Sequence, residues 1–484
     1  GKIGFDPWLH SVDEIEQYKR SMANTEITLQ ATQNLVDIIW KDQPSAPTEK
    51  SFPYEDEFAG ATQSSKRKTL AKELKINGNS AAVITLPEGI AWLLNIRGGD
   101  VEHLPIVQAF SILHSNNEVD IFVDKRKVEN LKEHFGDGIN LYNENDFLSQ
   151  LTRLTGSICI DKSSLPFAAY EGLLASKATL DPRGDITALP KACKNEIELS
   201  RARDAHLIDA IAMCKFLCWL NSQSAGILTE IDIVIELESF RSANPELYDI
   251  SFETICASGP NAALPHYRVN NDSNRTIKNG EVILIDSGGQ YKSGTTDITR
   301  TTALGQVSSE IKQAFTLVLK GMISISKLRF PKGMAGCDLD AFARVFLWSE
   351  GLDFAHGTGH GVGQFLSVHE GPQRLSRTSN VPFEAGMIIS NEPGFYKEGH
   401  FGIRIENLLT VSKAPKLEHS VVAEMFIFET LNFVPIDKNL IEKDLMSTDE
   451  IVWLNEYHSQ CREKIRAHLD ENERIWLDHA TNKL

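Results

Sequence analysis

Two aspartates in strand-like segments, Asp286 and Asp297, are the first candidates for chemistry in this sequence. The segment GEVILIDSGGQY alternates so that Asp286 shares a strand face with apolar residues, and TTDITRTT places Asp297 on a face of the next strand. Lys292, Ser293 and Gly294 are turn residues between the two strands, and symmetric pairing of positions that sum to 583 would set the two aspartates opposite each other, with Cβ atoms ~5 Å apart. Two like charges this close require a compensating cation or a shared proton.

A second pair of strand patterns repeats this arrangement with glutamates. GMIISNEP places Glu392 on one strand face, FGIRIENLL places Glu406 on another, and symmetric pairing about Gly399 sets the two glutamates opposite each other. Solvent-facing acids are the simplest alternative for either pair alone. Two such hairpins in one chain instead favour a site for divalent metal ions.

The segment HGTGHGVGQFLSVHEGP adds His356, His360 and His369. The spacing of His356 and His360 is that of a helical zinc pair, but the interleaved glycines disfavour a helix and favour a loop that approaches a ligand. One imidazole with four carboxylates is an oxygen-rich donor set that suits manganese, cobalt or iron. Five such ligands suffice for two ions ~3.5–4 Å apart. Another histidine, His266, follows Pro265 in SFETICASGPNAALPHY, where a surface or core role is the alternative to a site.

The composition of the whole chain is that of an anionic globular enzyme. Of 484 residues, 49 are Lys or Arg and 66 are Asp or Glu, and the net charge of −17 argues against nucleic-acid binding. Hydrophobic residues make up 42% of the chain, which is enough for the cores of two or three domains. The seven cysteines lack paired short spacings, which favours a reducing, cytoplasmic compartment. Cys214 and Cys218, four apart, are interpreted as core residues rather than a metal pair.

Neither a membrane segment nor a leader is expected. The most apolar stretch, 207–220, is interrupted by Asp209 and Lys215 and is shorter than the ~20 residues that a membrane span needs. The first residues, GKIGFDPW, lack a basic region followed by an apolar run, so no signal peptide is predicted.

The first two parts of the chain are expected to be α/β. Residues 1–60 would be the remnant of an N-terminal domain: a strand ending at 3–5, a helix with a capping box at Ser11 and Glu14, and a proline-containing linker at 41–53. Residues 61–182 alternate short apolar runs with helical stretches, which indicates an α/β domain. The expected strands lie at 81–86, 119–123 and 157–160, and the expected helices at 126–135 and 145–154. A basic cluster in this domain is interpreted as a solvated helix face: Lys66, Arg67 and Lys68.

The third part, residues 183–484, contains the candidate site. Helical patterns run from 196 to about 223 and from 229 to 242, and strands with glycine turns follow. Ser447 and Glu450 form a capping box before a C-terminal helix, which we expect to pack on the core or on a partner subunit.

Several segments, taken together and in chain order, resemble those of Xaa-Pro aminopeptidases of the three-domain, cytosolic aminopeptidase P type, which are pita-bread metallopeptidases. They are LNIRGGDVEHLP, FETICASGPNAALPHY, LIDSGGQYKSGTTDITRT, HGTGHGVGQFLSVHEGP and NEPGFYKEGHFGIRIENL. The resemblance implies an α+β pita-bread catalytic domain at 183–484 and a creatinase-like α/β middle domain at 61–182. It departs from the family at the N-terminus, where only the last βα unit of a first domain is recognisable.

The resemblance also implies roles for individual residues. Five residues match the metal ligands of the family: Asp286, Asp297, His360, Glu392 and Glu406. Glu392 additionally matches the general base. Three histidines match catalytic residues that bind the substrate and shuttle protons: His266, His356 and His369. Arg404 matches a residue that braces the metal carboxylates.

The implied activity is hydrolysis of the bond between an N-terminal residue and a following proline, by a hydroxide that bridges two divalent metal ions. Manganese is the expected ion, with cobalt or zinc as alternatives. The expected partners are peptides with proline at the second position and a second copy of the chain in a homodimer. Prolidase, which cleaves Xaa-Pro dipeptides, is the nearest alternative, and methionine aminopeptidase, which lacks a comparable middle domain, is a weaker one. A non-catalytic pita-bread binding module and a purely structural metal site also stay open, although the filled ligand positions favour an enzyme.

Overall fold

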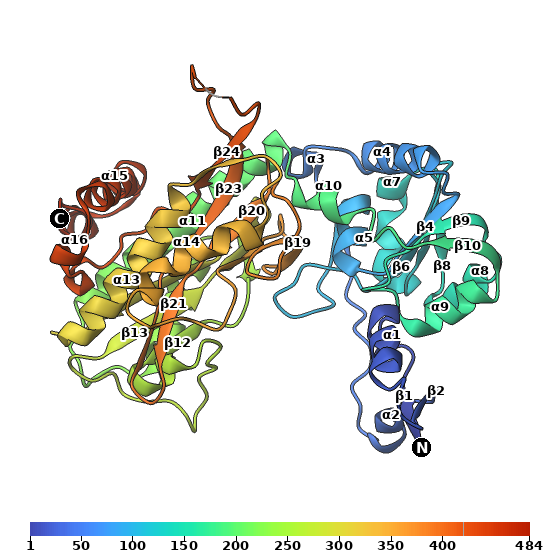
Figure 1. The fold of residues 1–484 in the computed structure, drawn as a ribbon, viewed down its shortest axis with the longest axis horizontal. Helices are drawn as coiled ribbons and strands as arrows, with labels where there is room; N and C mark the ends of the chain where they lie inside the picture. The colour runs from blue at the N-terminus through green and yellow to red at the C-terminus, as the bar shows by residue number, and fades with distance from the viewer. Residues whose placement is uncertain (420) are drawn as a thin grey trace. The chain divides into compact units, whose positions relative to one another are not determined.

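The computed structural model describes residues 1–419 and 421–484, and the chain divides into two compact units, 1–191 and 192–484 (Figure 1). Each unit has its own core and is described by itself. The expected boundary near residue 60, within the first unit, stays a prediction. None of the helices in the described part of the chain combines the length and apolar character that crossing a membrane requires.

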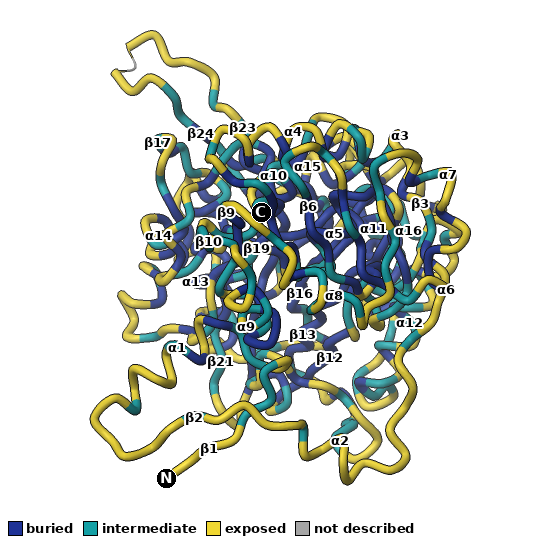
Figure 2. Tube along the Cα trace, turned by 90° about the vertical axis from the view of Figure 1, so that its right-hand side faces the viewer, coloured by how far each residue is buried: buried dark blue, intermediate teal, exposed yellow. Residues whose placement is uncertain are grey.

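The N-terminal segment contains the βα unit that the sequence predicted. Strands β1 (Lys2–Phe5) and β2 (Thr28–Ala31) pair in parallel on either side of helix α1 (Val12–Ser21). The predicted capping box is present, because Ser11 Oγ accepts the Glu14 N–H and the Glu14 carboxylate accepts the Ser11 N–H. Helix α2 (Leu35–Ile39) follows, and most of residues 1–50 are exposed (Figure 2).

A six-stranded mixed sheet in the order β10-β9-β4-β6-β7-β8 forms the centre of the first unit. Its strands are β4 (Ala81–Ile84), β6 (Phe110–His114), β7 (Val119–Phe122), β8 (Ile139–Tyr142), β9 (Thr155–Cys159) and β10 (Lys177–Asp181). The longer helices are α4 (Gln63–Ile76), α5 (Pro87–Leu94) and α9 (Phe167–Leu174). The helix expected at 126–135 is broken into α6 (Lys125–Val128), a 3-10 turn and α7 (Lys132–Phe135), and that at 145–154 is reduced to α8 (Phe147–Leu151).

The interpretation of the basic cluster on α4 as a solvated face is wrong for two of its three residues. Lys66 and Arg67 are 6% and 3% exposed, and only Lys68 faces solvent. Lys66 Nζ donates to the Trp92 carbonyl and to Asn95 Oδ1, and the Arg67 guanidinium donates to backbone carbonyls at 117, 137 and 138. These two cations connect α4 to the C-terminal part of α5 and to neighbouring loops of the first unit.

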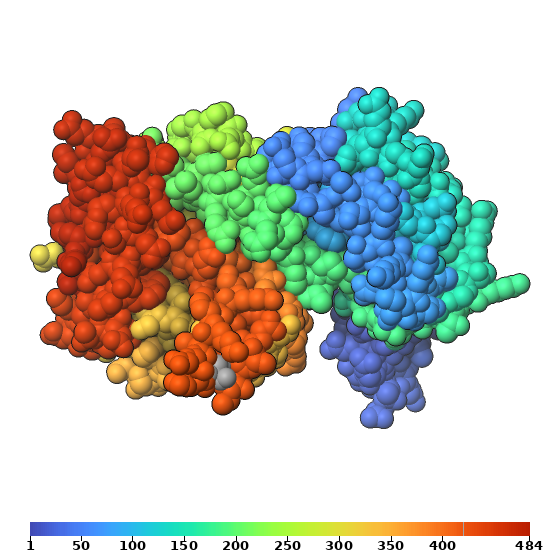
Figure 3. Space-filling model, turned by 90° about the horizontal axis from the view of Figure 1, so that it is seen from above, coloured from blue at the N-terminus to red at the C-terminus, as the bar shows by residue number. Residues whose placement is uncertain are grey.

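The second unit combines several antiparallel sheets with six α-helices among its described residues. The helices are α11 (Glu196–Asn221), α12 (Glu230–Ser242), α13 (Ser309–Ser326), α14 (Gly336–Trp348), α15 (Thr448–Ile465) and α16 (Glu471–Ala480). As expected, Ser447 and Glu450 form a capping box at α15, whose Leu454, Tyr457 and Cys461 are buried in the core of this unit. Figure 3 shows the C-terminal residues, in red, as a continuous area of its surface. Cys214 of α11 is a buried core residue, as predicted, whereas Cys218 is only partly buried.

The strands of the second unit position the candidate site. One sheet has the order β12-β13-β16, and a six-stranded sheet has the order β17-β24-β23-β20-β18-β19. The first consists of β12 (Ile255–Ser258), β13 (Val282–Ser287) and β16 (Ile298–Ala303). The second consists of β17 (Arg329–Pro331), β18 (Gly359–Gly361), β19 (Glu370–Leu375), β20 (Ile388–Asn391), β23 (Asn407–Lys413) and β24 (Met425–Thr430). Between β20 and β23 the chain forms a hairpin of β21 (Gly394–Lys397) and β22 (Phe401–Arg404).

One of the two predicted hairpin registers is correct. Around Gly399, Gly394 pairs with Arg404 and Asn391 with Asn407, so the strands flanking Glu392 and Glu406 have the expected symmetric register. The prediction that Asp286 lies opposite Asp297 is wrong, because Asp286 pairs with Thr299.

The position of the turn explains the error. Strands β14 (Gly289–Tyr291) and β15 (Gly294–Thr295) pair Tyr291 with Gly294, so the turn consists of Lys292 and Ser293. The predicted pairing places the centre of the turn one residue earlier, and this difference shifts every partner by two. Asp297 therefore stays on the same strand face as Thr299 and lies diagonally from Asp286.

Candidate metal centre

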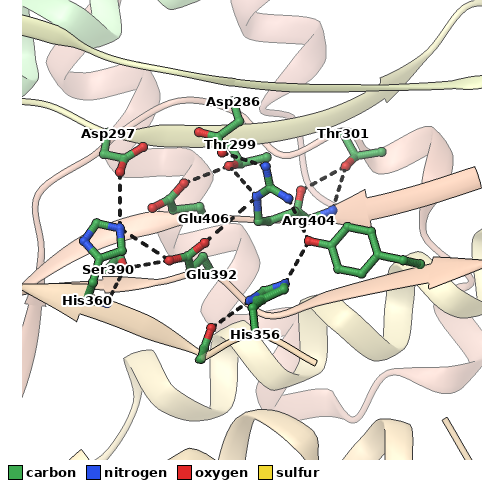
Figure 4. A network of polar contacts seen from close by, with 12 residues as sticks. Asp286, Asp297, Thr299, Thr301, His356, His360, Ser390, Glu392, Arg404 and Glu406 are labelled. Carbon is green, nitrogen blue, oxygen red and sulfur yellow. Dashed lines mark hydrogen bonds and ion pairs between the residues drawn. The ribbon is translucent and has the colours of Figure 1, made fainter. Parts of the chain in front are cut away.

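Five side chains that the sequence selected as ligands converge in the second unit (Figure 4). Asp286 lies in β13, Asp297 directly precedes β16, His360 lies in β18, Glu392 follows β20, and Glu406 lies between β22 and β23. His360 Nε2 is 3.5 Å from Asp297 Oδ2 and 3.4 Å from Glu392 Oε1. Asp297, His360 and Glu406 offer ligand atoms that all lie within 4.8 Å of one another.

Three carboxylate oxygens in this cluster have no donor. Asp286 Oδ1, Asp297 Oδ1 and Glu406 Oε1 are buried and have no hydrogen-bond partner among the residues that the structure describes. Burial, with the neighbouring acids as the next cause, raises the pKa of Asp297 and of Glu406 well above their ordinary values. Such a group of acids is costly when ionised unless a cation is bound, so the donor set fits divalent metal ions.

The hydrogen bonding of His360 fixes which ring nitrogen faces the acids. Its Nδ1 lies 2.9 Å from the Gly361 carbonyl oxygen, so Nδ1 carries the proton and donates. Nε2 is the ring nitrogen that faces the carboxylates of Asp297 and Glu392, and in the neutral ring it is available to bind a metal between them. Ser390 Oγ holds this part of the site by accepting the His360 N–H and donating to Glu392 Oε1 at 3.1 Å.

Arg404 connects the acids from the β22 side. Its Nη2 donates to Asp286 Oδ2 at 2.6 Å, and its Nε donates to Thr299 Oγ1 at 3.2 Å. Thr299 Oγ1 donates in turn to Glu406 Oε2 at 2.7 Å. One oxygen of each of these two acids is thus satisfied by protein, which leaves the other oxygen for a ligand. The expected contact between Arg404 and the carboxylates is present.

A tyrosine that the sequence did not indicate extends this network. Tyr396 Oη accepts from Arg404 Nη1 at 2.7 Å, so its own proton is donated to His356 Nε2 at 2.9 Å. His356 Nδ1 donates to the Gly357 carbonyl at 2.7 Å. Burial lowers the pKa of His356 to about 4 and raises that of Tyr396 to about 12, so both are neutral at pH 7.

Comparison with known proteins identifies the family. Residues 200–413 match the metallopeptidase family M24, residues 42–198 match the creatinase/prolidase N-terminal domain, and residues 424–484 match the C-terminal region of peptidase M24. Aminopeptidase P2 of Arabidopsis thaliana is 38% identical, with 100% of this chain and 74% of the relative covered. Aminopeptidase P1 of Lotus japonicus is 35% identical, with 99% and 83% covered. The chain belongs to the aminopeptidase P group of metallopeptidase family M24.

Solved structures agree with this assignment. The X-prolyl aminopeptidase of Caenorhabditis elegans, described as a cytosolic enzyme with a di-nuclear active site, superimposes with a TM-score of 0.94 at 32% identity over 100% of this chain and 81% of that one. The Xaa-Pro dipeptidase of Bacillus anthracis has the same fold over 78% of this chain and 99% of its own, with a TM-score of 0.62 at 23% identity. The expected pita-bread fold with a creatinase-like domain is confirmed.

A cavity of about 580 Å³ opens over the cluster of this M24 member. The three candidate histidines, His266, His356 and His369, line it together with four of the five candidate ligands. The rings of His266 and His369 are exposed in the cavity and make no hydrogen bond with the described residues, and the His369 ring packs edge-on against that of His360 at 4.2 Å. Glu406 lies deeper, at 1% exposure.

Three polar residues of the site were not predicted from sequence: Thr299, Ser390 and Tyr396. The two-residue strand period places Thr299 on the face of Asp297 and Ser390 on the face of Glu392, so the alternation could have revealed both. Strand alternation does not indicate Tyr396, because it lies in the β21–β22 hairpin and takes part only through the contact of its hydroxyl with Arg404.

Proposed function

We propose that this M24 metallo-aminopeptidase removes the first residue from peptides whose second residue is proline. The observation that carries the proposal is the group of buried carboxylate oxygens without donors among the described residues, gathered with His360 Nε2 beside a cavity. The names of the relatives, aminopeptidase P and X-prolyl aminopeptidase, support the choice of substrate.

Five residues would hold two divalent ions: Asp286, Asp297, His360, Glu392 and Glu406. When bound, such ions lower the pKa of a water toward ~7 and draw negative charge from the scissile carbonyl. The oxygen-rich donor set favours manganese, with cobalt or zinc as alternatives.

Glu392 is suited to move the proton. Burial raises its pKa above the ordinary value, its Oε1 is held by Ser390, and its Oε2 lies 4.0 Å from Arg404 Nε. A carboxylate with a raised pKa accepts the proton of the attacking water and then delivers it to the departing nitrogen. The proline nitrogen needs this proton because an amide nitrogen leaves as a neutral amine.

The histidines divide into two kinds. The ring nitrogens of His266 and His369 have no partner among the described residues, so these rings can donate to the scissile carbonyl as charge develops on its oxygen. His356 has both nitrogens engaged, by Tyr396 and by the Gly357 carbonyl, so contact with substrate would require it to exchange one of these partners. Its proposed role in proton transfer therefore passes through the Tyr396 hydroxyl.

Elemental analysis combined with a peptide assay tests the proposal. Purified protein should contain two equivalents of divalent metal, release Arg from a peptide beginning Arg-Pro, lose activity with a chelator and regain it with manganese. Faster cleavage of Xaa-Pro dipeptides than of longer peptides would identify a prolidase instead. Metal-loaded protein with no peptidase activity would indicate a binding module or a structural site.

The homodimer and the cytoplasmic location remain proposals of their own. Family resemblance supports a dimer built through the catalytic region, and the C. elegans relative is described as cytosolic. Sedimentation analysis at several protein concentrations would test the first, and fractionation of cells expressing the chain would test the second.

A further inference from the structure

His266 depends on its loop for its position. Its ring makes no hydrogen bond with the described residues, and it is exposed between Pro265 and Tyr267. The loop follows the short helix η3 (Gly259–Ala263). The position of the His266 ring therefore depends on the contacts that fix the backbone of this loop.

One buried carboxylate anchors this loop. Glu230, the first residue of α12, is 0% exposed, and the donors to it come from the loop and from the end of β12. Its Oε1 accepts the Ser258 N–H at 2.7 Å and the Ser258 hydroxyl at 3.0 Å. Its Oε2 accepts from Asn261 Nδ2 at 2.9 Å and from Tyr267 Oη at 3.0 Å.

Tyr267 connects Glu230 to the backbone of the adjacent residue, His266. The Tyr267 ring is 6% exposed and packs in a small apolar cluster with Ile255 and Ala257 of β12 and Leu284 of β13, the strand that contains Asp286. Its hydroxyl is the only polar part of the ring and is held by Glu230 and by residue Ser273. The backbone of His266 is therefore fixed on one side by a buried hydrogen bond.

The other side of the loop packs against the strand that contains Arg404. A Cβ atom at Gly402 in β22 would collide with the Ala262 carbonyl oxygen, so only glycine allows this approach. Gly259 adopts a φ of 47°, in the left-handed region, and opens the loop. The loop is thus confined between α12 and β22.

We propose that Glu230 is a positioning residue for hydrolysis, which holds the His266 loop at the cavity through Tyr267 and Asn261. The inference rests on the proposed function, since His266 matters only if it contacts the scissile carbonyl. Glu230 and Tyr267 do not line the cavity, so any effect on turnover has to pass through the loop.

Tyr267→Phe is the sharpest test, because it removes one hydroxyl and keeps the buried ring. A displacement near 1 Å can cost ~100-fold in rate, so the loss of one of several anchors should lower kcat ~10-fold with KM within ~2-fold. In a His266→Ala background the same change should lower kcat less than ~2-fold, because the two residues act on one step. Glu230→Gln turns the oxygen that faces Tyr267 into a donor and should lower kcat by the same factor. It is the second variant if Tyr267→Phe does not fold.

Tyr291→Phe is the matched control. Tyr291 is buried like Tyr267, and its hydroxyl donates to a buried carboxylate, Asp209, at 2.9 Å, but Tyr291 does not line the cavity. The Tyr291→Phe variant should lose stability as Tyr267→Phe does, but its kcat should stay at the wild-type value. Equal losses of kcat in both variants, or an equal effect of Tyr267→Phe with and without His266, would overturn the proposal.

A readout without substrate separates this inference from the proposed function. Arg268 is half exposed in the loop, so trypsin should cut after it several-fold faster in Tyr267→Phe than in wild type or Tyr291→Phe. If wild type does not cleave Xaa-Pro peptides, the proposed function fails and trypsin still decides the anchoring. If wild type cleaves and the cutting rates are equal, the anchoring is refuted.

Discussion

Replacing Lys194 with Met should destabilise the second unit strongly. Lys194 Nζ lies 2.5 Å from Glu370 Oε1, and the two side chains are 0% and 1% exposed. Removing the cation leaves a carboxylate buried without that counter-charge, and such breaks cost ~3–5 kcal/mol. The substitution therefore removes a large part of the ~5–15 kcal/mol that stabilises a typical protein.

The free energy of unfolding, measured in urea by circular dichroism, provides the assay. The control is Lys332→Met, because Lys332 is 47% exposed and lies 3.5 Å from Glu384 and 3.4 Å from Glu424. Its loss should cost less than ~1 kcal/mol. The double variant Lys194→Met, Glu370→Gln should regain most of the stability, since no uncompensated charge remains. An equal loss of unfolding free energy in Lys194→Met and Lys332→Met would refute the reasoning.

Three further predictions concern the site, the pH dependence of stability and the His266 loop. Asp297→Asn should abolish turnover and reduce bound metal measured by elemental analysis, and full metal content with full turnover would contradict the ligand assignment. Burial lowers the pKa of His458 to about 3, so between pH ~6.5 and ~3 the unfolded chain binds a proton that the folded protein does not, and stability falls as pH falls, by roughly 1.4 kcal/mol per unit. His458→Gln should remove this slope from urea unfolding measured between pH 4 and 7, whereas exposed His468→Gln should not. Gly402→Ala should lower the melting temperature and kcat together, because the added Cβ meets the Ala262 carbonyl oxygen, and unchanged values would show that the loop yields freely.

The sequence correctly predicted helix starts and one hairpin register, because these features depend on residues close together in the chain. The capping boxes at Ser11 and Ser447 begin helices as expected, and the symmetry about Gly399 correctly gave the register flanking Glu392 and Glu406. In each case the decisive residues lie within a few positions of one another in the chain or across one tight hairpin.

Features that depend on distant partners could not be predicted in this way. The register of Asp286 followed from a two-residue turn that the glycine and serine at 292–294 did not specify. The buried state of Arg67 depends on carbonyls 50 to 71 residues away, which no periodicity reveals. The role of Glu230 could not be predicted either, because its hydrogen-bond partners Ser258 and Tyr267 lie 28 and 37 residues away in the chain.

The distribution of the candidate ligands over two sheets has a kinetic consequence. Asp286 lies in the β12-β13-β16 sheet and Asp297 directly precedes β16, whereas His360 lies in the six-stranded sheet and Glu392 directly follows its strand β20. Separation of the two sheets would pull the candidate ligand atoms apart. Bound metal should therefore oppose this separation and slow amide hydrogen exchange in β13 and β20.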